Sequence, residues 1–285
     1  MCGYKYSLQG LLVASNRALP GLDPLDAVSQ PDVVFHAGLL PPGLDVREVQ
    51  RIEPFYRSPY TGPDGEPISR IWRCPEFDLY YIDFPEGLAF VVDSSGKTIW
   101  AQWPDRVSLE IVTAILLGRI LAFVLHLRGH VCLHASAVVV DGGAVLFAGN
   151  PGMGKSSTAA AFAERGFPVL SDDLSAVRRE GDGRLMVVPG VPRVCLWPDS
   201  VEFLYGPQSG RRFPLLLPEE SKHVVRLDGA AGKFQTEPAR FKAVCPPMVG
   251  RIASGFSFFI IISRTSAVKG SIYVASAVSG SVIIV

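Results

Sequence analysis

Residues 149–156 read Gly149-Asn150-Pro151-Gly152-Met153-Gly154-Lys155-Ser156 and decide the fold class of the chain. The stretch fits the pattern G-x-x-x-x-G-K-[ST], which is typical of loops that bind the phosphates of a nucleotide. Apolar residues 144–148 before it predict a strand, and the alanine-rich residues 156–165 after it predict a helix. Because strand, glycine loop and helix follow in this order, the sequence predicts an α/β fold with a P-loop nucleotide-binding core.

The residues of this loop have distinct expected roles. Glycines allow successive backbone N–H groups to turn toward phosphate oxygens, and the N-terminus of the following helix favours the same anion. Lys155 is expected to reach the β and γ phosphates, and Ser156 to place its hydroxyl on Mg²⁺. The sequence therefore predicts ATP and Mg²⁺ as cofactors, with GTP left open by the loop itself. The predicted nucleotide-binding residues are Gly149, Asn150, Pro151, Gly152, Met153, Gly154, Lys155, Ser156 and Ser157.

Segments on both sides of the loop extend this core. Ala137 to Val140 and Ala144 to Ala148 predict two strands, and Asp141-Gly142-Gly143 between them suits the positive backbone angles of a hairpin. A further strand is expected from Pro168, and residues 174–179 and 184–188 predict a second hairpin. The core is thus expected to mix parallel and antiparallel pairing in one sheet.

Two adjacent carboxylates, Asp172 and Asp173, end the strand that follows Pro168. P-loop proteins hold an acidic group at this place that supports Mg²⁺. Neighbours on a strand point to opposite faces, but a turn at the strand end can aim both side chains at the phosphate site. One carboxylate can then hold the metal while the other removes a proton. The alternative is that the second aspartate only caps the turn into Leu174.

His134 precedes the first hairpin strand, and a lone histidine at a strand end is usually structural. Together, however, Leu133-His134-Ala135, the Asp141-Gly142-Gly143 hairpin, residues 149–156 and Ser171-Asp172-Asp173 resemble the catalytic domain of HPr kinase/phosphorylase. The resemblance covers about residues 130–200. In its wider shape the chain is similar to the shorter HPr-kinase-like proteins, including kinases found with ribosomal-peptide and lasso-peptide biosynthesis genes.

The resemblance implies ATP-dependent phosphorylation of a serine or threonine hydroxyl on a protein or peptide, a lasso-peptide precursor being one candidate. By the same match Asp173 and His134 act at the reacting hydroxyl. The phosphate loop adds Lys155 as the third predicted catalytic residue, and Ser156 and Asp172 are the predicted metal ligands. The alternative is a P-loop ATPase or nucleotide-dependent switch without an acceptor, or a degenerate binding module. The absence of an N-K-x-D motif argues against a GTPase switch.

The chain also departs from the full-length enzymes of that family. Pro189-Gly190-Val191-Pro192-Arg193 stands near the place of their glutamate-containing metal motif, and no later loop matches the one used for phosphorylase work. A second metal ligand, the reverse reaction and HPr as the substrate are therefore without support. Arg193, Lys222 and Lys233 are candidates for contacts with phosphate or substrate, although each is more often plain surface.

The first 105 residues predict a smaller β-rich accessory domain. Leu79 to Phe84, Leu88 to Asp93 and Lys97 to Trp103 carry β-branched and aromatic residues typical of strands and predict a meander. Ser108 suits a helix N-cap, and the apolar residues 111–127 after it predict a buried core helix. Glu110, Arg119 and His126 argue against a membrane span there. The predicted domains are residues 1–105 and a catalytic domain of residues 106–285.

The composition limits the other classes of function and the cellular locations that the chain can have. Hydrophobic residues make up 48% and charged residues 19% of the 285, as in a folded globular protein. Lys plus Arg equals Asp plus Glu at 27 each, which argues against nucleic-acid binding. The five cysteines are widely spaced without a C-x-x-C pair, and no signal peptide is apparent, so a cytoplasmic location is expected. The sequence predicts no membrane partner and leaves homo-oligomerisation open.

Overall fold

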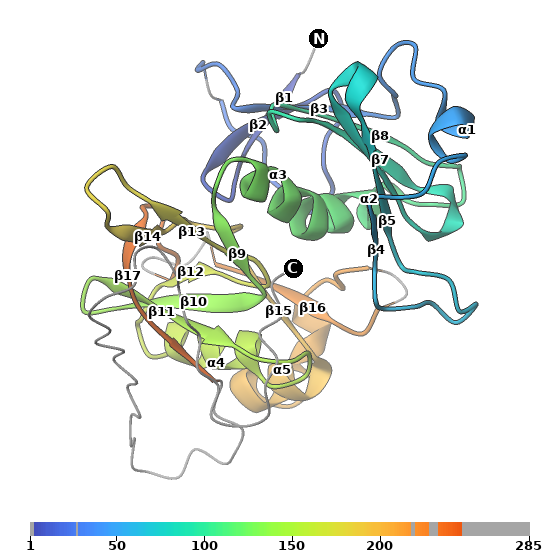
Figure 1. Cartoon of the computed structure of the whole chain (residues 1–285). Coiled ribbons are helices and arrows are strands. Elements are labelled where there is room, and N and C mark those ends of the chain that lie inside the picture. Colours follow the sequence, from blue (N-terminus) through green and yellow to red (C-terminus); the bar gives the residue numbers. More distant parts are fainter. Residues whose placement is uncertain (1–2, 27, 218–219, 228–232, 247–285) are drawn as a thin grey trace. The chain divides into compact units, whose positions relative to one another are not determined.

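The computed structural model describes residues 3–26, 28–217, 220–227 and 233–246 and divides into two compact units (Figure 1). The first unit runs from Met1 to Gly129 and the second from His130 to Val285. The sequence predicts a boundary after residue 105, whereas the observed division lies after Gly129. A strand considered for residues 256–262 lies outside the described residues.

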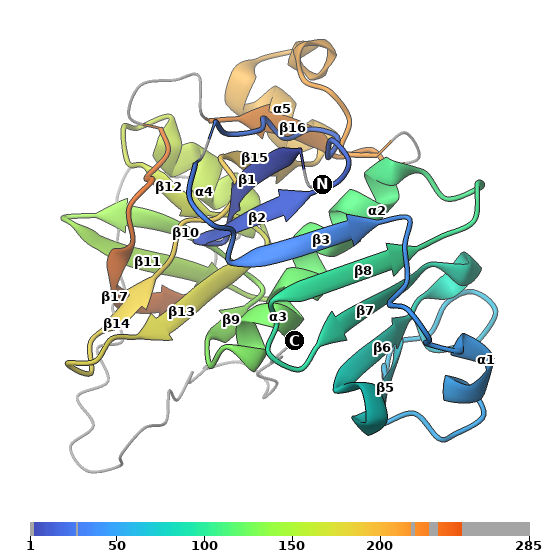
Figure 2. The ribbon, with the colours of Figure 1, turned by 90° about the horizontal axis from the view of Figure 1, so that it is seen from above.

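Within the described residues, the first unit holds an eight-stranded sheet in the order β1-β2-β3-β8-β7-β6-β5-β4 (Figure 2). Pairing is parallel between β2 and β3 and between β3 and β8, and antiparallel elsewhere. The predicted meander corresponds to β6, β7 and β8. The strands are β1 (Tyr4–Leu8), β2 (Leu11–Ser15), β3 (Val33–Ala37), β4 (Tyr56–Arg57), β5 (Arg70–Cys74), β6 (Leu79–Asp83), β7 (Ala89–Asp93) and β8 (Thr98–Gln102).

A continuous helix runs along one face of this sheet (Figure 1). It consists of α2 (Leu109–Ile115), a π-helical segment (Leu116–Ile120) and α3 (Leu121–Leu127). Ser108 caps it by accepting a hydrogen bond from the Ile111 backbone N–H at 3.4 Å. The rings of Tyr80 on β6 and Phe123 on α3 meet edge to face, with centroids 5.2 Å apart. This packing explains why the helix belongs to the first unit and not, as the sequence suggested, to the second.

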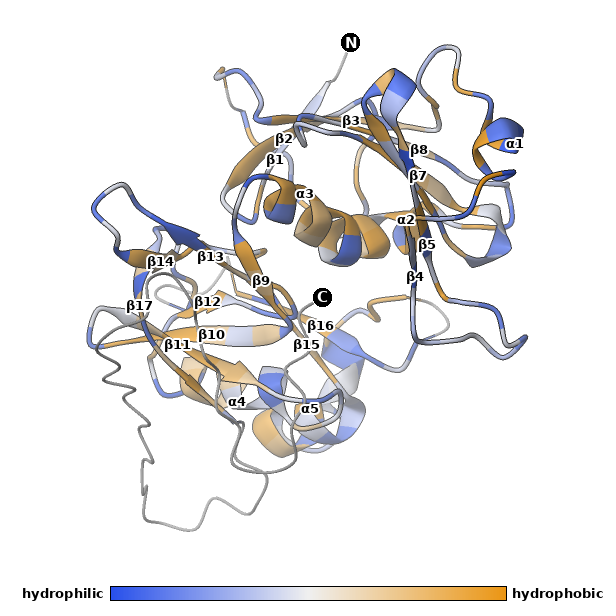
Figure 3. Cartoon of the chain, viewed as in Figure 1, coloured by the Kyte–Doolittle hydropathy of each residue, from blue (hydrophilic) through white to orange (hydrophobic). Residues whose placement is uncertain are grey.

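The same helix is long and apolar enough to cross a membrane by length and composition alone. Its most apolar window has a mean hydropathy of 1.9, and half of that window is buried in the structure. Figure 3 shows the helix as mostly apolar with separate hydrophilic residues. Such burial is what the predicted core helix requires. The buried side chains are Val112, Thr113, Leu116, Leu117, Ile120, Leu121, Ala122, Val124 and Leu125.

Helix α1 (Val46–Val49) covers part of the opposite face of the first sheet. Its Val49 packs in a buried cluster with Trp72, Leu79, Tyr81 and Val91. The rows of side chains on this face alternate with those under α2 and α3, as the two-residue repeat of a strand requires. Short 3₁₀ turns, Pro75–Phe77 and Pro85–Gly87, connect neighbouring strands.

Within the described residues, the second unit holds a seven-stranded sheet in the order β12-β10-β11-β17-β14-β13-β9, with a separate ribbon of β15 and β16. Among the strands that the structure describes in this sheet, only the β11–β17 pair is parallel, so the predicted mixed pairing is observed. The elements are β9 (Val131–Leu133), β10 (Ala135–Val140), β11 (Gly143–Ala148), α4 (Lys155–Ala163), β12 (Val169–Ser171), β13 (Ser175–Arg179), β14 (Leu185–Val187), β15 (Arg193–Leu196), α5 (Pro198–Tyr205), a 3₁₀ turn (Ser209–Arg212), β16 (His223–Arg226) and β17 (Ala239–Cys245).

The predicted hairpin and the helix after the glycine loop both appear in the second unit. Asp141 and Gly142 join β10 to β11 with φ of 47° and 71°, the left-handed pair that a tight hairpin turn needs. Helix α4 packs on the sheet through Ala159, Ala160 and Ala163, all of them buried. These small side chains allow the helix to approach the sheet closely, which fixes the loop at its N-terminus against the end of β11.

Candidate functional site

The glycine-rich loop, residues 149–154, connects β11 to α4. Gly152 and Gly154 have φ of 82° and 81°, a conformation that glycine adopts without a steric cost. The backbone N–H of Met153 donates to the Asn150 carbonyl at 3.2 Å and closes the loop on itself. Helix α4 begins at Lys155, directly after Gly154. The loop therefore presents a helix N-terminus and turned backbone N–H groups, an arrangement that suits an anion.

Lys155 points into this loop. Its Nζ donates to the carbonyls of Gly149 at 2.9 Å and Asn150 at 3.1 Å, and the residue is only 6% exposed. Burial lowers the pKa of Lys155, while the carboxylates of Asp173 and Asp172 act in the opposite direction. A desolvated ammonium whose hydrogen-bond acceptors are neutral carbonyls gains from a further anionic partner. The loop thus holds a cation next to the place where the motif predicts a phosphate.

Asp172 follows β12 and is held on both oxygens. Its Oδ1 accepts from the Ser136 hydroxyl at 2.6 Å, and its Oδ2 accepts from the Cys195 backbone N–H at 2.9 Å. Burial raises the pKa of Asp172, and hydrogen bonds from Ser136, Cys195 and Ser156 oppose that rise. The structure thereby brings Asp172 beside Ser156, the two residues that the sequence predicts for a metal.

A carboxylate and a hydroxyl side by side form an oxygen donor set of the kind that Mg²⁺ prefers. Among the residues that the structure describes, no group of three or more His, Cys, Asp or Glu side chains forms a metal site. Protein Mg²⁺ sites of nucleotide enzymes commonly use one or two protein oxygens, with phosphates and water completing the shell. Asp172 and Ser156 fit that arrangement.

Asp173 turns the chain away from Asp172. It adopts φ of 68°, and the Leu174 N–H donates back to the Asp172 carbonyl at 2.8 Å. A non-glycine residue in this region is uncommon and clusters at functional sites. The turn leaves the Asp173 side chain 62% exposed, whereas Asp172 is only partly exposed and is held on both oxygens. The two carboxylates therefore occupy different environments, as a division of roles requires.

His134 contacts Asp173 twice through one ring nitrogen. Its Nδ1 lies 2.9 Å from the Asp173 carbonyl oxygen and 3.2 Å from the carboxylate Oδ1. Because a carbonyl oxygen can only accept, Nδ1 carries the proton. The hydrogen bond to Asp173 raises the pKa of His134, and the same bond lowers the pKa of Asp173. Asp173 is therefore an exposed, ionised carboxylate held by an imidazole N–H.

A pair of buried serines braces this turn. Ser175 Oγ donates to the Ala135 carbonyl at 2.9 Å, so it accepts at 2.7 Å from Ser171 Oγ. Both serines are fully buried, and they flank Asp172 and Asp173 in sequence. Ser136 and Ser175 were not predicted from the sequence as site residues. Their signal was the polar side chain inside an otherwise apolar strand.

Replacing Ser175 by Ala should destabilise the second unit. The Ser171 hydroxyl and the Ala135 carbonyl would lose their partner in a buried place, which costs about 1–3 kcal/mol. Denaturant unfolding monitored in the full chain measures this loss. The matched control is Ser221→Ala at an exposed position. A Ser175→Ala effect no larger than that of the control would contradict the bracing role.

The ribbon of β15 and β16 adds a second lysine to the site. Cys195 of β15 donates to Asp172, and Leu196 pairs with His223, which places Trp197 and Lys222 next to each other beyond the last pair. Lys222 Nζ lies 5.2 Å from the centroid of the Trp197 ring. The positive charge of Lys222 lowers the pKa of both Asp173 and Lys155. Lys222 therefore stands within electrostatic reach of both residues.

The other candidate residues lie differently. Lys233 pairs with Glu164 at 2.7 Å, at the C-terminal end of α4 and away from the glycine loop. Arg193 begins β15, where its charge acts on the Cys195 thiol. The Ser157 hydroxyl is hydrogen-bonded to Ser200 of α5 at 2.8 Å. Of the three basic candidates, the structure brings Lys222 to the predicted site.

Comparison with known proteins gives a distant likeness. No protein-family model matches the sequence, and no curated protein matches it. Among solved structures, part of the chain is similar to the Hpr(Ser) kinase/phosphatase from Coxiella burnetii, with 23% identity and a TM-score of 0.22. The match covers 33% of this chain and 60% of that chain, which is less than two thirds of that structure. The likeness is partial and says nothing of the substrate.

Proposed function

We propose that the second unit is a kinase that transfers the γ-phosphoryl group of ATP to a serine or threonine hydroxyl of a peptide or protein. One observation carries this proposal. Asp173, an exposed carboxylate held by His134, lies within electrostatic reach of Lys155 in the glycine loop. A base beside a phosphate-binding cation is what hydroxyl phosphorylation needs.

Binding of the nucleotide uses the loop and its lysine. Lys155 exchanges the carbonyls of Gly149 and Asn150 for the β and γ phosphates, whose oxygens are stronger acceptors. Backbone N–H groups of the loop and the N-terminus of α4 bind the same phosphates. Asp172 and Ser156 would hold Mg²⁺, which when bound offsets the negative charge of the phosphates. Lys222 contributes a second positive charge on the side of the acceptor.

Transfer to the acceptor then rests on Asp173. Its carboxylate accepts the proton as the hydroxyl oxygen forms a bond to the γ phosphorus and the bond to the β–γ bridging oxygen breaks. ADP leaves with that bridging oxygen, and the new phosphate ester carries no proton from the hydroxyl. His134 Nδ1–H fixes the orientation of the carboxylate through the 3.2 Å contact. Most of the rate enhancement comes from positioning and electrostatics, because the phosphoryl transition state is loose.

An acceptor screen tests this proposal. The full chain is incubated with γ-labelled ATP, Mg²⁺ and peptides encoded beside its gene, and the labelled residue is mapped. The proposal predicts label on a single serine or threonine, and loss of label when that residue is changed to alanine. Release of inorganic phosphate with no labelled peptide would favour the alternative, an ATPase or switch. A cytoplasmic location and the absence of nucleic-acid and membrane partners stay predictions.

Replacing Lys222 by Met should slow transfer about tenfold or more, because a charge-assisted contact to phosphate is lost. Lys222→Arg keeps the charge and should restore much of the rate. The control is Lys233→Met, which removes a lysine of the same unit whose partner is Glu164. The measurement is kcat/KM for ATP at fixed acceptor. Equal values of kcat/KM in the Lys222→Met and Lys233→Met variants would show that Lys222 takes no part in the transfer.

A further inference from the structure

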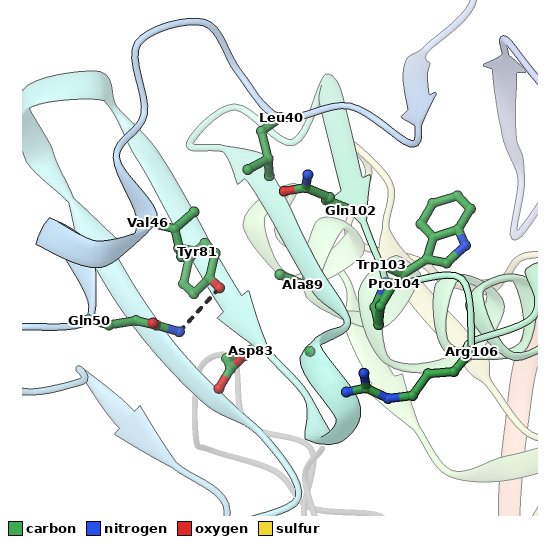
Figure 4. A pocket seen from close by; sticks show the side chains of 11 residues that line it. Leu40, Val46, Gln50, Tyr81, Asp83, Ala89, Gln102, Trp103, Pro104 and Arg106 are labelled. Carbon is green, nitrogen blue, oxygen red and sulfur yellow. Dashed lines mark hydrogen bonds between the residues drawn. The ribbon is translucent and has the colours of Figure 1, made fainter.

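The first unit carries a cavity of about 480 Å³ that the proposed chemistry does not use (Figure 4). It lies wholly within that unit, on the face of the sheet that α1 partly covers. Its polar lining comes from Gln50 after α1, Tyr81 and Asp83 on β6, Gln102 on β8, and Arg106. An apolar cavity with a few converging polar groups is a usual form of binding site.

Strand register explains where the cavity forms. Asp83 pairs with Ala89, and Ala89 pairs with Gln102, so the three side chains form one row across β6, β7 and β8. Helix α1 packs over the neighbouring row through Val49 and Tyr81. The methyl group of Ala89 fills little of the space above its own row. The floor of the cavity is therefore a small apolar residue with a carboxylate on one side and an amide on the other.

Asp83 indicates which charge a ligand of this cavity would carry. Its side chain is only 18% exposed, and burial raises the pKa of Asp83. Arg70 Nε lies 3.8 Å from Asp83 Oδ2, beyond hydrogen-bond distance, and Arg70 also faces Glu66 at 3.4 Å. A buried carboxylate is costly unless a cation or hydrogen-bond donor compensates it. The Asp83 carboxylate is thus only partly compensated within the unit.

The other walls of the cavity can contact the backbone and the side-chain stem of a bound peptide residue. Gln50 Nε2 donates to the Tyr81 hydroxyl at 3.4 Å, and both lie on the same side as Asp83 in Figure 4. Across the cavity, Arg106 donates to the Glu86 carbonyl at 2.6 Å, which holds its guanidinium at the rim. Its remaining N–H groups can donate to acceptors such as peptide carbonyls. The stem of a long side chain can lie on Ala89 and Tyr81 with its charged end at Asp83.

We propose that this cavity binds a lysine or arginine side chain of the peptide or protein substrate, with the cation at Asp83. That the bound side chain belongs to a substrate rests on the proposed function, whereas the binding of a basic side chain does not. The cavity would then recognise the acceptor through a residue other than the one that is phosphorylated. This gives the first unit a part in choosing the acceptor.

Binding is tested without ATP, using the full chain and two probes: the peptide acetyl-Gly-Gly-Lys-Gly-Gly-amide and the same peptide with Nε-acetyl-lysine. Chemical shifts of the tryptophan indole and glutamine amide N–H groups report occupancy at Trp103, Gln50 and Gln102, and Trp197 of the second unit serves as an internal control. The lysine peptide should cause saturable shifts in the cavity. The acetyl-lysine peptide should bind with an affinity at least about tenfold lower, because the charge of the side chain is lost.

Two variants and a control decide the outcome. Asp83→Asn keeps the shape and should abolish the shifts. Gln102→Lys, at an exposed position across Ala89 from Asp83, should weaken binding by adding a cation to the cavity. Asp105→Asn, an exposed carboxylate outside the cavity, should leave binding unchanged. Equal binding of both peptides, binding that survives Asp83→Asn, or no shift at all would overturn the proposal. Because no nucleotide is present, failure of the kinase assignment would not affect this result.

Discussion

Replacing Asp173 by Asn is expected to lower single-turnover phosphoryl transfer by about 10²- to 10⁴-fold, the usual contribution of a positioned base. Mg²⁺-ATP binding should persist, because Asp172 and Ser156 are unchanged. Asn also tolerates the left-handed backbone at this position, where φ is 68°, so the turn should survive. Binding and transfer are measured separately in rapid-mixing and titration experiments. Asp182→Asn, at the exposed β13–β14 turn, is the control.

The pH dependence of the transfer rate is a second measurement on the same variant. The contact with His134 lowers the pKa of Asp173, so the base stays ionised through neutral pH and is lost only as pH falls through that lowered pKa. The same contact raises the pKa of His134, so the imidazole loses its charge as pH rises through the raised pKa. The two groups titrate as a coupled pair. Transfer at the wild-type rate in Asp173→Asn, with the acid limb intact, would show that another group is the base.

Replacing Lys155 by Met is expected to reduce transfer by about 10²-fold or more, because the cation that meets the β and γ phosphates is removed. Met keeps much of the side-chain volume, and burial already disfavours the charged form of Lys155, so the fold should persist. The measurements are ATP affinity by titration and transfer under single-turnover conditions.

Lys242 offers a matched control for this change. Its Nζ also donates to two backbone carbonyls, those of Val140 at 2.9 Å and Asp141 at 2.8 Å, but at the hairpin end of β11 and not at the loop end. Lys242→Met should therefore leave ATP binding and transfer unchanged. Similar losses in both variants would trace the effect to general stability. An unaffected Lys155→Met protein would contradict the assignment of the loop.

Local sequence signals predicted the elements that local chemistry determines. Asp141-Gly142-Gly143 predicted the hairpin because its residues suit positive φ, and the structure has φ of 47° and 71° there. The alanines after Lys155 predicted α4, and Ser108 predicted the start of the α2–α3 helix. The predicted boundary after residue 105 differs from the division after Gly129, because a helix N-cap marks where a helix starts and not the sheet on which the helix packs. The contact of Phe123 with Tyr80 decides that.

Long-range placement accounts for what the sequence did not predict in the site. Strand β17 pairs with β11, which lies more than 90 residues earlier in the sequence, and no local pattern reports such pairing. The Cys195 N–H reaches Asp172 through β15, and Lys222 reaches the site only because β16 pairs with β15. The motif residues His134, Asp172 and Asp173 could be selected in advance. The division between a carboxylate held by Ser136 and Cys195 and an exposed one needed the turn at Asp173.

The proposed function requires that the site transfer the phosphoryl group to a hydroxyl and not to water. Its most direct test follows γ-labelled ATP with the full chain and Mg²⁺, in the presence and absence of a peptide acceptor, and partitions the label between peptide and inorganic phosphate. We expect label on the peptide hydroxyl, with little release of inorganic phosphate when the acceptor is absent. Phosphate release at one rate with or without acceptor, and no labelled peptide, would contradict it.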